Sequence, residues 1–157
     1  MCNNIDLLKT KNMKKLLFLL FAVSIFTVAC QKDEVVPPKP IDKFVKTFNG
    51  NLKTYTCEEN QALLNTNPAS VIITKENDTD LLGSLKDDSG NKLFTFSGKF
   101  NAAKENEFKI SNFSYNSETL FGAGEMIDGK LKLSFASFNC QVDSSNTYRV
   151  TREFKEN

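Results

Sequence analysis

Short β-like runs separated by turn residues constrain the fold of this chain most strongly. No segment shows the sustained 3.6-residue period of an amphipathic helix, and the turn signals recur at spacings typical of barrels and sandwiches. The pattern predicts an all-β domain, an antiparallel up-and-down meander of about eight strands, with one short helical turn at Glu58–Asn65. The expected strands are Lys43–Thr56, Ser70–Glu76, Asp80–Lys86, Lys92–Asn101, Glu107–Tyr115, Thr119–Ile127, Lys130–Phe138 and Thr147–Phe154.

One hairpin can be predicted to the residue. Asp128-Gly129 lies between two β-like runs, and Asp-Gly favours a two-residue type I′ turn because both central residues need a positive φ. With Ile127 opposite Lys130, one face is apolar and the other carries a favourable charge pair. This register pairs Met126 with Leu131, Gly124 with Leu133, Gly122 with Phe135 and, on the other face, Glu125 with Lys132.

Alternation predicts three further local features. The alternation of apolar and polar residues slips by one position near Ser111–Asn112, which indicates a β-bulge. A hairpin at Asn49-Gly50 would set Lys46 opposite Lys53, and two like charges directly opposite each other destabilise a strand pair. We therefore expect one long strand bent at Gly50. Two inward-facing stripes are expected, one of Phe94, Phe96, Gly98 and Phe100, the other of Tyr148, Val150, Arg152 and Phe154.

The N-terminus has the layout of an export signal. Met13-Lys14-Lys15 precedes an apolar run from Leu16 to Val28, which is shorter than the about 20 residues that span a bilayer. The run ends at Ala29-Cys30, which resembles the lipobox of bacterial lipoproteins, whose cysteine is diacylated before cleavage. Residues 1–29 are therefore predicted to be a lipoprotein signal peptide with its start at Met13, and an ordinary signal with an accidental cysteine is the alternative.

The residues after Cys30 extend this prediction. Gln31, Lys32, Asp33 and Glu34 resemble the export signal that directs lipoproteins of some Gram-negative bacteria to the outer face of the outer membrane; a solvated charged tether is the alternative. Val35–Pro40 is expected to be a stiff extended spacer, because each proline fixes φ. We expect a lipidated, charged and proline-rich tether over residues 30–41 and a single β domain over residues 42–157.

Cysteine counting agrees with export. Cys2 precedes the expected start and Cys30 is the expected lipid anchor, which leaves Cys57 and Cys140 as an even pair. In an oxidising compartment this pair is expected to form a disulfide. The alternative is two separate buried thiols, since a free cysteine behaves as a small hydrophobe.

A family resemblance points to a barrel. The bent first strand ending in cysteine (Phe48-Asn49-Gly50 to Thr56-Cys57), the segment Phe121–Gly124 and the Asp-Gly hairpin resemble small lipocalin-like lipoproteins. These are calycin-type up-and-down β-barrels of uncharacterised function on bacterial outer membranes. The likeness spans most of residues 43 to 154. It implies a closed barrel and an outer-membrane address, and it carries over no catalytic residue.

Little in the sequence indicates chemistry. The chain has no His, which excludes His-based triads and His-ligated metal sites. The net charge of +1 argues against nucleic acid. The carboxylates lie mostly in expected turns, where they are usually solvated. Asn77–Asp80 has alternating oxygen ligands but lacks the glycine and distal Glu of an EF-hand loop. We therefore expect no enzyme activity, no cofactor and no metal.

The interior phenylalanines leave one question open. Phe94, Phe96, Phe100, Phe108 and Phe135 either line an apolar cavity or fill the barrel, and an eight-stranded barrel allows both.

Three functions remain, in decreasing order of preference. The first is a surface lipoprotein, anchored in the outer membrane by its lipid, whose barrel binds an apolar ligand or an envelope protein. The second is a structural subunit of an outer-membrane assembly, with a packed interior and an unpaired edge strand. The third is a His-free hydrolase using two carboxylates.

Overall fold

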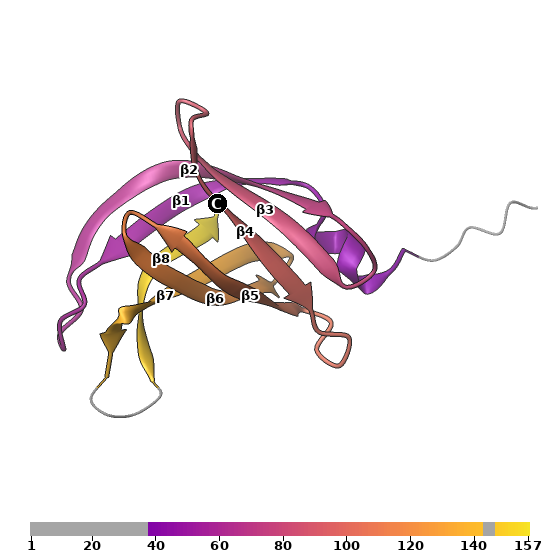
Figure 1. The fold of residues 1–157 in the computed structure, drawn as a ribbon. Coiled ribbons are helices and arrows are strands. Elements are labelled where there is room, and N and C mark those ends of the chain that lie inside the picture. Colours follow the sequence, from indigo (N-terminus) through magenta and orange to yellow (C-terminus); the bar gives the residue numbers. More distant parts are fainter. Residues whose placement is uncertain (1–37, 143–146) are drawn as a thin grey trace, which may run out of the picture. The chain divides into compact units, whose positions relative to one another are not determined.

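The computed structural model describes residues 38–142 and 147–157, and its eight strands form a closed antiparallel barrel (Figure 1). Each strand pairs with the next along the chain, and the last strand pairs with the first. The predicted eight-stranded meander is confirmed, and so is the barrel. The strands are β1 (Thr47–Tyr55), β2 (Leu63–Lys75), β3 (Asp80–Asp87), β4 (Lys92–Phe100), β5 (Glu107–Tyr115), β6 (Glu118–Ile127), β7 (Lys130–Gln141) and β8 (Tyr148–Glu156).

A short 3-10 helix, η1 (Pro40–Phe44), precedes β1. The sequence predicts a strand from Lys43, and that start is wrong. Pro40 lies in the first turn of the helix, where its missing N–H would have no intrahelical partner in any case. Ile41 and Phe44 are three residues apart, so one 3-10 turn places both on the same side, where they are buried against the barrel.

Strand β2 begins earlier than expected. The described residues contain no helical turn at Glu58–Asn65; instead Leu63 pairs with Tyr55 of β1 across a bulge. Pro68 suggests a strand boundary, because proline is confined to edges and bulges of sheets. In the structure Pro68 pairs with β1, but the pairing of β2 with β3 starts only at Ala69. The missing N–H of Pro68 therefore costs no hydrogen bond to β3.

The β6–β7 hairpin has the predicted register. Ile127 pairs with Lys130, and every further pair expected from the sequence is present. Asp128 and Gly129 have φ angles of 51° and 78°, as a type I′ turn requires. The turn residues, the apolar face and the charge pair each favour this one register, and this agreement explains why the register could be predicted from the sequence.

Two other local predictions are also confirmed. The pairing of β5 with β6 shifts between Ile110 and Phe113, which is the expected bulge. Strand β1 runs through Gly50 without a turn. A Cβ at Gly50 would lie 2.1 Å from the backbone oxygen of Lys155, so only glycine allows this close approach of β1 and β8.

Phenylalanine rings pack against glycines in the barrel interior. A Cβ at Gly83 would lie 2.1 Å from the ring of Phe96, and one at Gly98 would lie 2.8 Å from the ring of Phe108. The strands therefore use glycine where a ring of a neighbouring strand needs the space.

Candidate binding site at the barrel mouth

The two ends of the barrel differ in how they are covered. We call the end that carries η1 and the β2–β3, β4–β5 and β6–β7 connections the sealed end, and the opposite end the mouth. At the sealed end Ile41 is 1% exposed and Phe44 is fully buried. Near the mouth the inward-facing residues Phe113, Tyr115 and Arg152 are only partly buried. The mouth is therefore the end through which solvent reaches inward-facing side chains.

Arg152 is a charged residue in an inward-facing position. Phe154, two residues later on β8, is fully buried, and side chains of a strand alternate between its faces. Arg152 pairs with Phe135 of β7 and with Thr54 of β1. Its side chain is 12% exposed, so the guanidinium lies in the mouth rather than on the outer surface.

The guanidinium has two main partners. Its Nη1 donates to Oε2 of Glu118 at 2.9 Å, and its Cζ lies 5.2 Å from the centre of the Tyr115 ring. Tyr115 ends β5 and Glu118 begins β6. The turn between them, Asn116-Ser117, has positive φ angles at both residues. This turn brings the aromatic ring and the carboxylate to the same cation.

The arginine does not use all its donors. A guanidinium has five N–H groups in a planar fork, and within the described residues only Nη1 makes a hydrogen bond, to Glu118 and at 3.4 Å to Thr151. No buried side-chain nitrogen or oxygen of the described residues lacks a partner. Nε and Nη2 of Arg152 are therefore not sealed from solvent, and they offer donors to a group that enters the mouth.

The five phenylalanines singled out from the sequence fall into two groups. Phe94, Phe96 and Phe135 pack together and against Phe113, with ring centres 5.1 to 6.4 Å apart, and Phe94 also contacts Tyr115. Phe100 and Phe108 lie toward the sealed end, where both contact Phe44. These contacts support the interpretation that the rings fill the barrel.

Sequence reasoning missed the polar residues of the mouth. Arg152 alternates with Phe154 in the predicted inward-facing stripe, and a cation in that stripe is the signal that could have identified it. Glu118 and Tyr115 give no such signal, because only the barrel pairing brings them to Arg152.

The rest of the predicted stripe is wrong: the pairing of β7 with β8 shifts between Arg152 and Val150, and Tyr148 packs against Phe121 and Phe138 outside the barrel.

The disulfide shapes the rim of the mouth. Cys57 and Cys140 are bonded, with Cα atoms 5.1 Å apart, which confirms the pairing expected from the cysteine count. Nη1 of Arg149 donates to the backbone oxygen of Cys57 at 2.9 Å, and Nε2 of Gln61 donates to that of Val150 at 2.8 Å. The β1–β2 connection is thus held against β8 at the rim.

Several predicted site residues lie outside the described residues. Cys30 and the expected export signal Gln31, Lys32, Asp33 and Glu34 are among them, as are residues 35–37, the first half of the expected spacer. The last two residues of the expected tether, Pro40 and Ile41, belong to η1.

The acidic turn Asn77–Asp80 uses its oxygens within the protein. Oδ1 of Asn77 accepts hydrogen bonds from the backbone N–H groups of Thr79 and Asp80, both at 2.9 Å. Asp78 forms ion pairs with Lys39 and Lys75. Among the described residues, no three His, Cys, Asp or Glu side chains gather as metal ligands.

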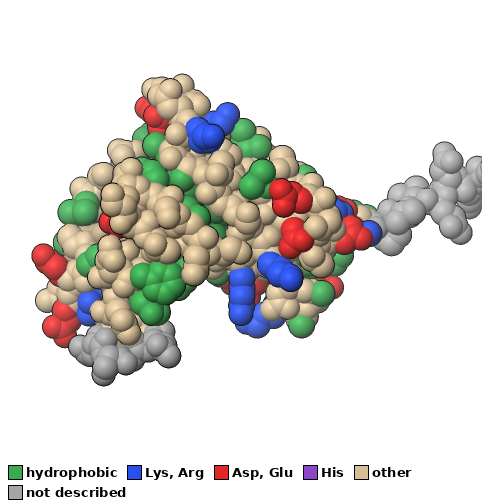
Figure 2. Space-filling model, in the orientation of Figure 1, with side chains coloured by type: hydrophobic (Ala, Val, Ile, Leu, Met, Phe, Trp, Pro, Cys, Tyr) green, Lys and Arg blue, Asp and Glu red, His purple; other side chains and the backbone are tan. Residues whose placement is uncertain are grey.

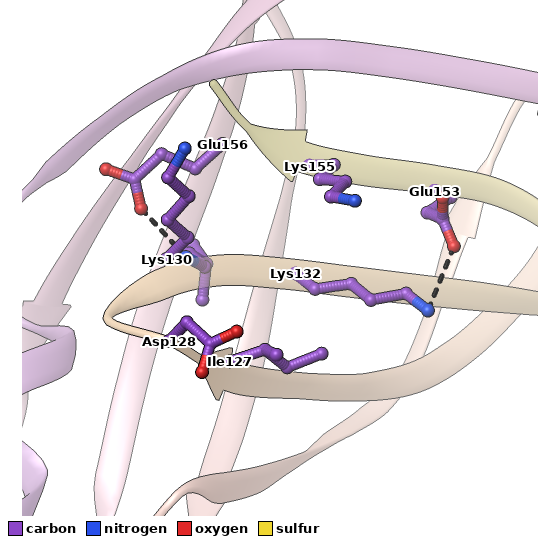
Figure 3. Close-up of a pocket in the computed structure, with 8 residues that line it drawn as sticks. Ile127, Asp128, Lys130, Lys132, Glu153, Lys155 and Glu156 are labelled. Atoms are coloured by element: carbon purple, nitrogen blue, oxygen red, sulfur yellow. Dashed lines mark hydrogen bonds and ion pairs between the residues drawn. The ribbon is translucent and has the colours of Figure 1, made fainter.

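A shallow pocket of about 400 Å³ lies on the outer face of β7 and β8 (Figure 3). Lys132 pairs there with Glu153 at 3.1 Å, and Oε2 of Glu156 accepts the backbone N–H of Leu131 at 2.8 Å. Three lysines and three carboxylates line it, so the charges balance. The lining residues are Ile127, Asp128, Lys130, Leu131, Lys132, Glu153, Lys155 and Glu156.

Aromatic side chains also gather outside the barrel. Phe121, Phe138 and Tyr148, from β6, β7 and β8, lie with ring centres 4.6 to 5.2 Å apart. Phe138 is 40% exposed, and Figure 2 shows exposed hydrophobic side chains over this part of the molecule. We call these three residues the outer aromatic cluster.

Compared with models of known protein families and with curated protein sequences, the chain matches none. Among the described residues, no helix is long and apolar enough to cross a membrane.

Proposed function

We propose that this protein is an exported lipoprotein, anchored in the outer membrane through Cys30 and displayed at the cell surface, whose barrel is a non-catalytic binding module with the mouth as its binding end. The anchor is supported by the lipobox-like Ala29-Cys30, and the observation that carries the choice of the mouth as the binding end is the direction in which the chain enters the barrel. Lys39 pairs with Asp78 in the β2–β3 connection, so the chain enters at the sealed end, and the mouth lies at the other end.

Chain length supports the same orientation. Lys39 is nine positions after Cys30, and a fully extended chain gains at most about 3.3–3.6 Å per residue. A lipid on Cys30 would therefore keep the sealed end within about 30 Å of the bilayer. The attachment at the sealed end makes the mouth the end of the barrel that is farther along the chain from the anchor, and we propose that it faces away from the membrane, where a ligand can reach Arg152.

The second function considered from the sequence agrees with the packed interior, in which phenylalanine rings fill the barrel, but it has less support from the strand edges. Strand addition needs an open strand edge with free backbone groups. The β1–β8 pairing joins the first strand to the last, and the part of β2 beyond β3 is interrupted by a bulge near Tyr55 and by Pro68. Bulges and prolines are features that protect edges from further pairing. The β4–β5 seam pairs only from Gly98 to Phe100, which leaves a short unpaired stretch of β4 rather than a long free edge.

The orientation can be tested by energy transfer to the membrane. The lipidated protein would carry a donor dye at Asp88→Cys in the β3–β4 connection or at Glu105→Cys in the β4–β5 connection, both exposed positions. The nine residues of β4 separate the two positions by about 20–25 Å along the barrel axis, at 3.3 Å per residue and a tilt of 35–45°. Acceptor dyes on lipid headgroups should quench the dye at position 105 more strongly. Equal or reversed quenching would contradict the proposal.

A further inference from the structure

We infer that the mouth of the barrel binds an oxyanion, a carboxylate or a phosphate, carried by a partly apolar ligand and held by the guanidinium of Arg152. This inference rests on the proposed function, in which the mouth is the binding end, and it names the class of ligand. Three features of the mouth carry it: the unused donors of Arg152, the exposure of Glu118 and the aromatic wall below them.

The geometry of the arginine selects the anion. Arginine binds carboxylates and phosphates with two parallel N–H···O bonds, and such bidentate pairs are stronger and more specific than single bonds. Glu118 contacts Arg152 through Nη1 alone. The guanidinium is therefore neutralised, but its fork is only partly used, and two oxygens of a carboxylate or a phosphate can accept hydrogen bonds from the remaining donors.

Glu118 can give way to a ligand. Its side chain is 34% exposed, against 12% for Arg152, and it stands at the first position of β6 beside the Asn116-Ser117 turn. The carboxylate can turn toward water without leaving a buried charge behind. Arg152 cannot do so, and thus a ligand anion would replace Glu118 as its partner.

The surroundings define the rest of the ligand. The Tyr115 ring faces the guanidinium, and the partly buried Phe113 contacts Phe94, 5.1 Å between ring centres. An apolar or aromatic group attached to the anion would lie against these rings. A small, strongly hydrated ion without an apolar group would make only the polar contacts.

The test is a titration of the lipidated protein in phosphatidylcholine nanodiscs, followed by calorimetry, with empty nanodiscs as the blank. The probes are benzoate and phenyl phosphate, with benzyl alcohol as their neutral counterpart. We expect both anions to bind and benzyl alcohol to bind at least about tenfold more weakly, because it lacks the charge-assisted bonds.

Variants separate the role of each residue. Arg152→Gln should weaken benzoate binding about tenfold or more, and Arg152→Lys should restore part of it, since lysine keeps the charge but not the fork. Glu118→Gln should tighten binding about two- to fivefold, because it removes a competing ion pair. Lys92→Gln, which removes an exposed cation at the mouth end of β4, is the matched control and should leave binding unchanged.

The outcomes are distinct. Equal binding of benzoate and benzyl alcohol, no loss in Arg152→Gln, or no binding of any probe overturns the oxyanion assignment. A Glu118→Gln variant that loses stability without gaining affinity also overturns it, because the ion pair would then be purely structural. Energy transfer in the same nanodiscs tests the orientation separately, so a failure of the proposed function can be told from a failure of the ligand class.

Discussion

The ring of Phe108 occupies the space that a side chain at Gly124 would need. The two residues are cross-strand partners on β5 and β6, and a Cβ at position 124 would lie 2.1 Å from the ring. Phe108 is fully buried and its ring is held edge-on by Phe44, 5.1 Å away. The glycine, the ring and η1 thus form one packed unit at the sealed end.

Gly124→Ala should destabilise the barrel. The added methyl group must displace a buried ring that has no room to move, and overpacking of this kind costs about 1–3 kcal/mol. Urea unfolding measures the loss. Ala123→Ser adds one atom at the adjacent exposed position of β6 and should have little effect. Equal stability of Gly124→Ala and the wild type would contradict this packing.

Phe44→Ala should cost about 3–5 kcal/mol, the range for removing a buried phenylalanine. The expected cause is the loss of the ring contacts with Phe100 and Phe108, which opens the sealed end. Val45→Ala truncates the neighbouring residue, which is 36% exposed, and serves as the control. Thermal unfolding of both variants should separate them clearly. A Phe44→Ala protein as stable as Val45→Ala would show that η1 does not seal the barrel.

Reduction of the disulfide should lower the free energy of unfolding. Cys57 and Cys140 are 83 residues apart, and the chain-entropy model gives about 4–5 kcal/mol for a loop of this size. Urea unfolding with and without a reductant measures the difference. The double variant Cys57→Ala, Cys140→Ala should not respond to the reductant. A wild-type protein whose unfolding is also unchanged by the reductant would contradict a stabilising bond.

An ion-pair network makes the attachment of η1 depend on pH. Lys75 lies 2.9 Å from Asp42 in η1 and 3.3 Å from Asp78 in the β2–β3 connection. The hydrogen bond from Lys75 lowers the pKa of Asp42, and hydrogen bonds from Lys39 and then Lys75 lower the pKa of Asp78. Both carboxylates therefore favour the folded state above their ordinary pKa of 3.8, and this contribution is lost as the pH falls below it.

Lys75→Gln tests the sign of this dependence. The variant should have a lower Tm than the wild type at pH 7, and the difference should shrink as the pH falls below 3.8, the ordinary pKa of both carboxyls. Because the hydrogen bond to Asp42 raises the pKa of Lys75, the difference should also shrink at alkaline pH, as Lys75 loses its proton. Asp42 and Asp78 are exposed and Lys75 is partly exposed, so added salt should weaken the effect. A difference in Tm that is constant from pH 7 to below 3.8 would contradict the network.

The sequence predicted those parts of the fold that depend on residues close together in the chain. The Asp128-Gly129 turn and the bulge after Ile110 follow from turn chemistry and side-chain alternation, which adjacent residues show. The sequence did not indicate η1, because a single helical turn has no period to detect. The sequence also misplaced the start of β2. Pro68 can lie within β2 only because β3 ends opposite Ala69, so that the missing N–H of Pro68 faces no partner strand, and sequence pattern does not show where β3 ends.

The candidate site was less predictable for a similar reason. The cysteine pair follows from counting, and the buried phenylalanines follow from alternation. The contact of Arg152 with Glu118 joins residues 34 positions apart, and only the order of strands in the barrel places them together. A charged residue in an otherwise apolar stripe is thus a useful signal of a functional position in such sequences.

Intact mass tests the anchored-lipoprotein proposal most directly. Protein from the membrane fraction of its host would be measured with and without reduction, beside the same fraction from a Cys30→Ala strain. The proposal predicts a chain that begins at Cys30, carries acyl groups and gains two protons on reduction of the Cys57–Cys140 bond, and it predicts that the lipidated species is absent from the variant strain. A chain that begins elsewhere and carries no lipid would contradict it.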